Sequence, residues 1–469
     1  MDIQNSIVFE SIQSLSAWEA KSFGRWLASP FFNAKPSLPP LFNYLHRCHA
    51  AGHVPDPEDA FKAAFPDKKM FDDQKLQYAC SWLQSQLRQF FAWQEMQAEP
   101  LRAEIYAVRN ARKRGLEKQF RQAWREAEQA LKKGPEHGMD THLAGFQLFF
   151  EKYQWELARK RGHEMPFGPL LTHLSAFSSA RAFQLGCMVR AQEAILRQSL
   201  TIAPQLDRLL SGVPDTAVAA LPEVALYHVG YRMLEQPEES RWSEQFRDLL
   251  RQHSGHFPLQ EARDLLMLAI NHCIRRINRG DTASLPEILG FYELGLEKKL
   301  LHDERGFLSK YTYNNILMAI LALEDWPRAE NFLEAYKDQL PAAERDHIYA
   351  YNLAIFHFRQ GAYDQAQELL RSLNMSDAMY NLEVRKMLLK IYYEQNAFDA
   401  LESLLENLLT WLRRHGEIGY HREMYRNLAR FTGKLLSLPP SDREKREKLA
   451  KKIRDTPLVA ERSWLLSKI

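Results

Sequence analysis

The 469-residue sequence has few cysteines, few β-strand signals and no long apolar run. Its four cysteines lie far apart with no Cys-x-x-Cys pair, which predicts reduced thiols and no disulfide framework. No run of alternating β-branched residues lies between tight-turn pairs, so a sheet is not expected. Charged residues interrupt every apolar stretch well short of the roughly 18 residues that a membrane span needs.

The sequence also lacks a strong charge of either sign. It has 62 Lys and Arg against 59 Asp and Glu, a net charge of +3, which by itself implies neither a nucleic-acid partner nor a membrane partner. The start, Met1 to Asn5, is polar and lacks the basic-then-apolar layout of a signal peptide. We therefore expect a cytoplasmic protein with no membrane partner.

What the sequence does contain is helix-forming residues, since Leu, Ala, Glu, Gln, Arg and Lys dominate. Hydrophobic residues at 45% and aromatics at 12% are ample for a buried core. The length exceeds the usual size of one compact core. We predict an all-α chain with an N-terminal helical domain at 1–98, irregular helix pairs at 99–305, regular repeats at 306–440 and C-terminal capping helices at 441–469.

Local signals place several helices in the first 98 residues. Ser16-Ala17-Trp18-Glu19 fits a capping box, and that helix should end near Ser29-Pro30. Pro36 to Pro40 is interpreted as a linker, and Asp56-Pro57 as the start of another helix. Between 73 and 97, apolar residues recur at helical spacing and predict one buried stripe. They are Leu76, Ala79, Cys80, Leu83, Leu87, Phe90 and Phe91.

Near the other end, Ser441-Asp442-Arg443-Glu444 is interpreted as a second capping box, opening a charged helix that extends to about Asp455. A last amphipathic piece, 459–469, carries Trp464 and Leu465. A repeat array needs a polar cap at its end, and this segment fits that role.

Three segments in the later half align with one another. Their aromatic residues Trp326, Tyr363 and Phe398 are separated by 37 and 35 residues. Each segment predicts a first helix with a small or apolar pair, a short turn with the aromatic, and a second helix. Such short helix pairs cannot bury their apolar faces alone, so they stack on the next pair.

This pattern resembles tetratricopeptide (TPR) repeats, whose period is about 34 residues. The middle segment matches the family best, through Leu353, Ala354, Gly361, Tyr363, Ala366 and Leu370. The third departs from it, with Leu401 where the family prefers alanine. The whole chain also looks like bacterial TPR-like proteins, which supply no function. The resemblance implies a right-handed α-solenoid of helical hairpins that follows the N-terminal helical block.

The same resemblance implies that the first helix of each pair lines a concave groove for a peptide or protein segment. The amides of Asn315 and Asn352 then fall where the family holds a ligand backbone, and Lys386 and Lys390 can hold a carboxylate. The family's carboxylate clamp is incomplete, because Asn314 and Met318 replace its lysine and asparagine. The predicted groove residues are Tyr311, Asn314, Asn315, Tyr351, Asn352, Arg359, Lys386, Lys390 and Tyr393.

A basic segment at 101–134 supports an alternative, nucleic-acid-binding interpretation. This segment contains ten basic residues and only four glutamates, and Phe120 and Trp124 can offer stacking surfaces. The same residues equally fit a solvated helix face over a core of aromatics. The candidate patch is Arg109, Arg112, Lys113, Arg114, Lys118 and Arg121.

Signs of catalysis or of a cofactor are missing from the sequence. It has no glycine-rich phosphate loop and no Gly-x-Ser-x-Gly elbow. His46, His49 and His53 share a helical face, but no carboxylate or second cysteine completes a ligand set. We predict a non-enzymatic scaffold or adaptor without cofactor or metal that binds a protein or peptide. The alternatives are a peptide-responsive regulator and a nucleic-acid-binding solenoid.

Overall fold

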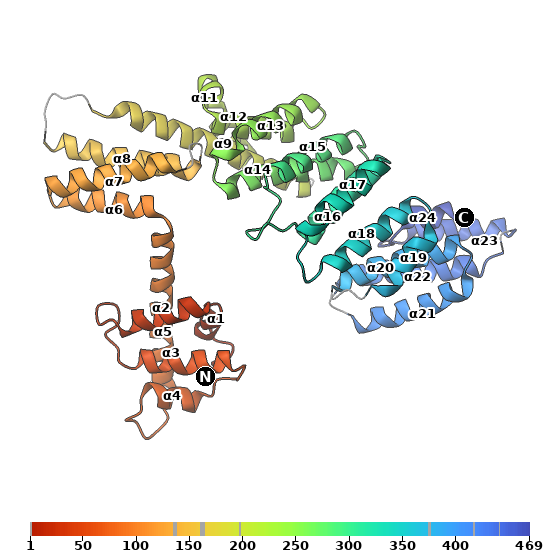
Figure 1. Ribbon diagram of the computed structural model, residues 1–469, viewed down its shortest axis with the longest axis horizontal. Coiled ribbons are helices and arrows are strands. Elements are labelled where there is room, and N and C mark those ends of the chain that lie inside the picture. The colour runs from red at the N-terminus through yellow and green to blue at the C-terminus, as the bar shows by residue number, and fades with distance from the viewer. Residues whose placement is uncertain are drawn as a thin grey trace. The chain divides into compact units, whose positions relative to one another are not determined.

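The computed structural model describes residues 2–134, 138–159, 165–196, 198–373, 377–415, 418–439 and 441–469. Within these ranges the chain forms 24 α-helices and two short 3-10 helices, with no strand (Figure 1). An isolated bridge joins His302 to Leu308. The predicted all-α fold is therefore confirmed for the described residues. None of their helices combines the length and apolar character that a membrane crossing requires.

The chain divides into two compact units, residues 1–178 and 179–469. The helices that begin in the first unit are α1 (Ile7–Gln13), α2 (Ala17–Ala28), α3 (Leu38–Ala50), α4 (Pro57–Ala64), α5 (Asp73–Ala98), α6 (Pro100–Lys113), α7 (Glu117–Lys133), α8 (Met139–Leu157) and α9 (Phe167–Leu196). The last of these contains the division point.

Helices α1 to α5 share one apolar core. Phe23 of α2 lies at its centre, edge-on to Phe42 of α3 at 4.9 Å between ring centroids and 5.3 Å from Phe90 of α5. The predicted stripe on α5 is buried along its length, except that Phe91 is half-buried. The predicted linker at 36–40 is wrong in its second half. Helix α3 already begins at Leu38, because prolines fit the first turn of a helix, where no backbone N–H is needed.

The caps decide where three helices begin. Ser16 and Glu19 form the predicted capping box of α2, and Asp56 caps α4 by accepting from the backbone N–H groups of Glu58 and Asp59. The second predicted capping box is wrong. Helix α23 begins at Arg443, and its cap is Asp442, which accepts from the Lys445 N–H. Asp442 stands directly before the first helical residue, and aspartate is as good an N-cap residue as serine, so it takes the capping position in place of Ser441.

Helices α6, α7 and α8 form a smaller core of their own. Phe120 of α7 is stacked face to face on Trp155 of α8, with ring centroids 4.1 Å apart. Ile105 and Val108 of α6 are fully buried in the same cluster. Phe120 and Trp124 of the basic segment are part of this core.

The second unit continues with α10 (Ala203–Ser211), α11 (Asp215–Ala220), α12 (Pro222–Glu235), α13 (Ser240–His253), α14 (Leu259–Asn278), α15 (Ser284–Glu297), α16 (Lys310–Ala322), α17 (Trp326–Tyr336), α18 (Arg345–Arg359), α19 (Tyr363–Ser372), α20 (Ala378–Glu394), α21 (Phe398–Arg414), α22 (His421–Leu436), α23 (Arg443–Asp455) and α24 (Arg462–Ser467). The 3-10 helices are Ser254–His256 and Lys337–Gln339.

Helices of this unit pack in consecutive pairs, including α12 with α13, α14 with α15, α16 with α17, α18 with α19 and α20 with α21. The first helices of the last three pairs also contact one another in series, α16 with α18 and α18 with α20 (Figure 1). This arrangement places one face of each first helix on a common side.

The turns inside these three pairs have the same backbone geometry. A residue with positive φ follows the first helix in each case: Glu324 at 55°, Gly361 at 78° and Asn396 at 55°. Two residues later the second helix opens with its aromatic residue, Trp326, Tyr363 or Phe398. The three turns therefore share a residue with positive φ at the same position before the second helix.

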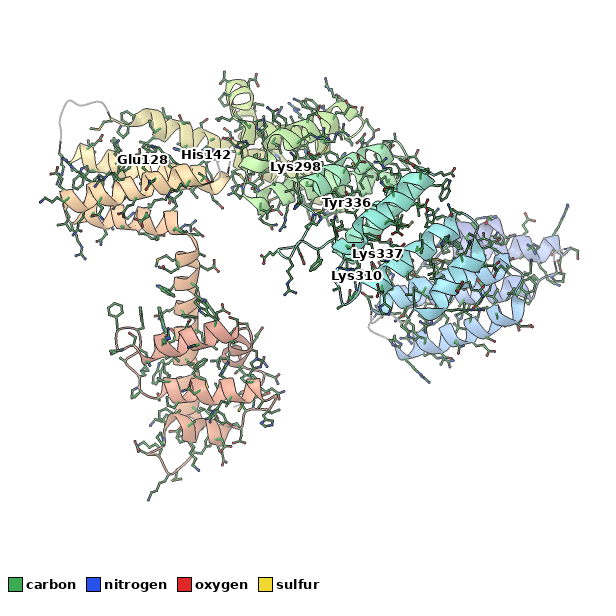
Figure 2. The ribbon with its side chains drawn as sticks, viewed as in Figure 1. Glu128, His142, Lys298, Lys310, Tyr336 and Lys337 are labelled. Atoms are coloured by element: carbon green, nitrogen blue, oxygen red, sulfur yellow. The ribbon has the colours of Figure 1, made fainter. Side chains whose placement is uncertain are left out.

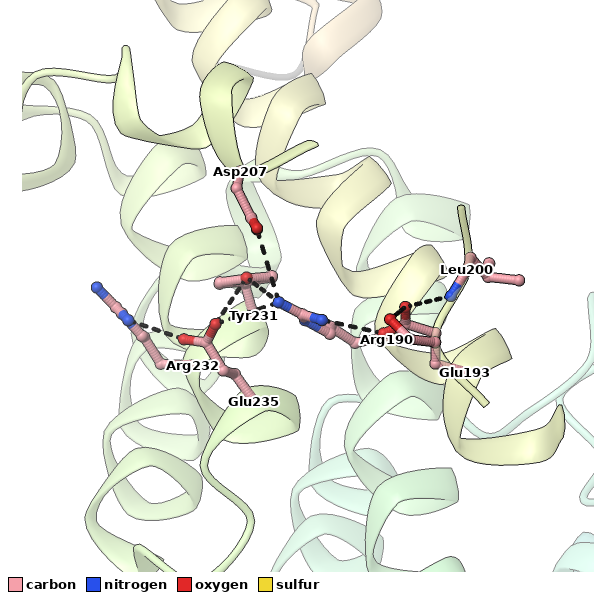
Figure 3. Close-up of polar contacts among 8 residues, drawn as sticks. Arg190, Glu193, Leu200, Asp207, Tyr231, Arg232 and Glu235 are labelled. Carbon is pink, nitrogen blue, oxygen red and sulfur yellow. Dashed lines mark hydrogen bonds and ion pairs between the residues drawn. The ribbon is translucent and has the colours of Figure 1, made fainter. Parts of the chain in front are cut away.

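A polar network joins α9 to α12 (Figure 3). The Arg190 guanidinium pairs with Glu193 at 3.0 Å and Glu235 at 3.4 Å, and donates to the Tyr231 hydroxyl at 3.0 Å. Glu193 in turn accepts from the backbone N–H of Leu200 at 2.8 Å. These contacts join α9 to α12 and hold Leu200, in the chain after α9, against Glu193.

Candidate functional site

A cavity of about 560 Å³ lies between the first helices of the three similar pairs. This volume is in the range of ligand pockets. Helices α16, α18 and α20 each contribute one face, and one residue comes from the segment before α24. The lining residues are Tyr311, Asn314, Asn315, Met318, Tyr351, Ile355, Phe358, Arg359, Met379, Tyr380, Glu383, Lys386, Met387, Lys390 and Glu461.

Helical periodicity explains why these side chains meet. On α16 the lining residues 311, 314, 315 and 318 follow the spacing of one helix face, whereas Tyr313, Ile316 and Leu317 on the other faces are buried. Helices α18 and α20 show the same division. Each first helix therefore packs its apolar faces against neighbours and turns a mixed aromatic and polar face to the cavity.

Two buried tyrosines give the cavity hydrogen-bonding capacity. Tyr351 is 4% exposed and Tyr380 is 6% exposed, and their rings meet edge-on with centroids 5.0 Å apart. In the described part of the chain neither hydroxyl has a hydrogen-bond partner, although both residues line the cavity. Burial raises the pKa of both phenols, so both hydroxyls stay protonated and can donate to a ligand.

The charged end of the cavity is formed by α20 and by the segment before α24. Lys390 lies 2.9 Å from the Glu461 carboxylate, and Lys386 lies 3.3 Å from the same carboxylate. Lys386 also pairs with Glu383, which accepts from the Tyr425 hydroxyl of α22. Two lysines thus share two carboxylates.

The pKa shifts of Lys386 and Glu461 favour the charged form of each side chain. Burial alone would lower the pKa of Lys386, but the nearby Glu383 and Glu461 carboxylates outweigh it and raise that pKa. Burial alone would raise the pKa of Glu461, but hydrogen bonds and charge from Lys390 and Lys386 hold it below its ordinary value. The lysine end of the cavity is therefore a partly desolvated ion-pair network at neutral pH.

Arg359 adds a further positive charge at the end of α18. Its side chain is exposed, and no carboxylate of the described residues pairs with it. The cavity thus has three cations, Lys386, Lys390 and Arg359, against two carboxylates, Glu383 and Glu461. The excess positive charge favours an anionic group on a ligand.

At the other end of the cavity, the rim is held by Asp377. This residue caps α20 by accepting from the N–H groups of Met379 and Tyr380. It also accepts from Lys310, which is labelled in Figure 2, at 3.1 Å, and from the Tyr311 hydroxyl at 3.2 Å. Asp377 therefore links the start of α16 to the start of α20.

The structure places seven of the nine predicted groove residues on this one cavity, all except Asn352 and Tyr393. Asn352 is fully buried, and its amide donates to the Ile348 carbonyl one turn earlier. Tyr393 packs edge-on against Trp464 of α24 at 5.3 Å. These two residues support the helices around the cavity.

Sequence reasoning missed Tyr380, Glu383 and Glu461. The helical spacing from Lys386 back along α20 leads to Glu383 and then to Tyr380, so that signal was present in the sequence. Glu461 carries no such signal. It lies 71 residues after Lys390 and reaches the cavity only because the chain folds back.

The basic segment has a different construction. Arg109 and Arg112 of α6 both pair with Glu151 of α8 at 2.6 Å, and Glu151 is 3% exposed. Arg121 pairs with Glu117, and Arg114 donates to the Asn110 side chain. A buried carboxylate of this kind fixes the arginines within the protein, so their role here is structural.

Three members of the predicted patch, Lys113, Arg114 and Lys118, are exposed without an acidic partner in the part of the chain that the structure describes, and of these Arg114 is held by the Asn110 amide. Two aromatic residues of the segment are also engaged. Phe120 is stacked on Trp155, and Trp124 meets Phe149 edge-on at 5.4 Å. The third aromatic residue, Tyr106, is exposed, and the Arg109 guanidinium lies 5.6 Å from its ring centroid.

The described residues hold no cluster of three or more His, Cys, Asp or Glu side chains arranged for a metal ion. His46 of α3 lies beside the Phe42 ring at 5.6 Å between centroids, and His53 lies beyond the end of α3. The three histidines therefore do not share one helix.

These observations define an all-helical protein whose helices pack in consecutive pairs, with a cavity between three neighbouring first helices. Comparison with protein-family models, with curated proteins and with solved structures finds no match to the chain. Its function must therefore be argued from the cavity itself.

Proposed function

We propose that this protein is a non-enzymatic scaffold or adaptor that binds an extended segment of a partner protein in the cavity between α16, α18 and α20. The observation that carries this proposal is that three neighbouring helices turn aromatic, amide and cationic side chains into one cavity. Such a mixture suits a peptide, which offers backbone amides and side chains together.

The repeated turns support a TPR-like interpretation of α16 to α21. Glu324, Gly361 and Asn396 have the same left-handed geometry, and each precedes an aromatic residue that opens a second helix. In a solenoid of helical hairpins, first helices line one side of the array, where extended ligands bind. We propose that these helices are three such hairpins, in a right-handed α-solenoid.

The chemistry of the cavity favours binding without covalent change. Its polar groups are three tyrosine hydroxyls, two asparagine amides, three cations and two ion-paired carboxylates. The thiols lie elsewhere, and burial raises the pKa of Cys187 to about 12 and that of Cys80 to about 11. No activated nucleophile faces the cavity within the described residues.

Site-specific photocrosslinking in cells tests this function. A benzoylphenylalanine is placed at Tyr311, which is 57% exposed on the cavity rim, and at Tyr420, which is 62% exposed and does not line the cavity. We expect discrete protein adducts at position 311 that are absent at position 420. Equal adducts at both positions, or none at 311, contradict the proposal.

A conservative double variant then assigns the adducts to the cavity. Tyr351→Phe/Tyr380→Phe removes both unpartnered hydroxyls and keeps the rings, so crosslinking at 311 should fall about tenfold, as expected for losing two hydrogen bonds. Tyr313→Phe is the matched control, because that hydroxyl donates to the Leu333 carbonyl inside the core. Unchanged crosslinking in the double variant contradicts binding in the cavity.

A further inference from the structure

Glu461 reaches the cavity from the short segment between α23 and α24. Its carboxylate lies against Lys390 at 2.9 Å and Lys386 at 3.3 Å, although both lysines belong to α20, more than 70 residues earlier. Its hydrogen bonds and ion pairs in the described chain go to these two lysines. The chain thus places one of its own carboxylates on the cationic wall of its own cavity.

The segment that carries Glu461 is firmly docked on both sides of it. Asn427 of α22 donates to the Leu458 carbonyl, and the Ala460 N–H donates to the Met424 carbonyl. After Glu461, the Trp464 indole and the Lys468 ammonium both bind Glu394. The backbone is therefore fixed, and the Glu461 side chain is the part that can leave the lysines.

The backbone at Glu461 is also strained. Its φ of 52° and ψ of 36° lie in the left-handed region, and Leu458 three residues earlier has φ 52°. A non-glycine residue in this region is uncommon, and such strain tends to collect at functional sites. This conformation directs the Glu461 side chain back to α20 instead of to solvent.

The two lysines do not depend equally on Glu461. Lys386 keeps Glu383 as a partner when Glu461 leaves. Lys390 loses its carboxylate but stays beside the rings of Phe358, at 5.4 Å, and Trp464, at 5.8 Å. An incoming carboxylate therefore finds Lys390 already positioned, with Arg359 as a second unpaired cation on the same cavity.

We propose that the partner segment carries an aspartate or glutamate side chain next to an apolar one, and that its carboxylate takes the place of Glu461 on Lys390. Glu461 is then a built-in competitor that keeps weak or uncharged segments out. The apolar neighbour packs on Met318, Ile355 and Met387, which line the same cavity. This inference rests on the proposed function, and it names the chemistry of the ligand.

Peptide selection on the full chain tests the inference. Displayed random twelve-residue peptides are selected on the Glu461→Gln variant, and one enriched peptide is synthesised with a fluorescein label. We expect enriched peptides to carry an acidic residue beside an apolar one. By fluorescence anisotropy the labelled peptide should bind Glu461→Gln about tenfold more tightly than wild type, because no internal carboxylate competes. Adding Lys390→Gln to that variant should abolish this gain.

Glu394→Gln is the matched control, since it removes an equal charge from the end of α20, where Trp464 and Lys468 of the docked segment bind, without taking Glu461 from Lys390. The peptide should bind this variant as it binds wild type. If Glu394→Gln shows the same gain in affinity for the peptide, the effect comes from loosening of α24, and the inference is overturned.

The remaining outcomes separate the inference from the proposed function. Enriched peptides without an acid, or equal affinity for wild type and Glu461→Gln, overturn the role of Glu461. If the affinity for the labelled peptide nevertheless falls in the Tyr351→Phe/Tyr380→Phe variant, the cavity remains a peptide site. If no peptide binds either protein, both proposals are overturned.

Discussion

The basic helices α6 and α7 and the cavity between α16, α18 and α20 carry the same kinds of side chain and use them differently. In the first region, arginines converge on a buried carboxylate of α8 and the aromatic rings fill a small core. In the second, tyrosines and cations line a hollow of about 560 Å³, and several keep unused donors. The types of side chain in a region therefore do not show whether it binds a ligand. What distinguishes a structural region from a binding site is whether its side chains already have partners.

The largest effect that this contrast predicts is at Glu151. Glu151→Gln removes the buried charge that holds Arg109 and Arg112, and should lower the free energy of unfolding of the α6–α8 region by about 3 kcal/mol. Hydrogen exchange measured by mass spectrometry on α6 and α8 peptides checks this. Glu128→Gln is the control, because Glu128 forms an exposed ion pair with Lys132. It should change the free energy of unfolding by less than about 0.5 kcal/mol. If hydrogen exchange is similar in the two variants, Glu151 contributes no more to stability than an exposed charge does.

The corresponding change in the cavity should be smaller. Glu461→Gln leaves Lys386 its second carboxylate, so we expect a loss of about 1–2 kcal/mol at pH 7 in urea unfolding of the second unit. Because the folded-state pKa of Glu461 is lowered, its stabilising contribution is present above the ordinary value of 4.5 and is lost as the pH falls below it. Wild type and variant should therefore converge in acid. A difference that persists unchanged at low pH would show that the charge of Glu461 is not the cause.

A third change sharpens the contrast at the rim of the cavity. Asp377→Ala removes the cap of α20 together with the partner of Lys310 and Tyr311, and should cost about 1 kcal/mol. Asp377→Asn keeps the cap and should cost less than about 0.5 kcal/mol. Urea midpoints of the two variants measure the difference. Equal losses would assign the role of Asp377 to its charge instead of to its cap.

The smallest effect is expected on the basic helices. Lys113→Gln/Lys118→Gln changes the two exposed lysines of the patch and should leave stability within about 0.5 kcal/mol of wild type. Gel shifts at low salt with single-stranded RNA and duplex DNA should show no complex for either protein. A complex with wild type that weakens steeply with salt and disappears in the variant would restore the nucleic-acid interpretation.

Much of the local structure could be predicted from the sequence. The capping residues Ser16 and Asp56 and the buried stripe on α5 depend on neighbours within a few residues. The aromatic residues Trp326, Tyr363 and Phe398, which were predicted in the short turns, stand at the end of those turns as the first residues of the second helices. Two local predictions failed, the linker at 36–40 and the Ser441 capping box. In both cases the same residue types fit a helix start in a second way.

Part of the candidate site could also be predicted, because it depends on residue spacing within single helices. Tyr311, Asn315 and Lys386 follow from helix periodicity once the pairs are in register. Asn352 shares that register but is buried, because α18 lies between α16 and α20 and is covered on more of its surface.

By itself the sequence determined the helical fold, the caps and the repeated turns, because these depend on hydrogen bonds and side-chain spacing within a few residues. Only the tertiary structure decided which charges are paired, as Glu151 and Glu461 show. Both residues act on partners about 40 and 70 residues away in the chain, and such ion pairs form only when packing brings the helices together.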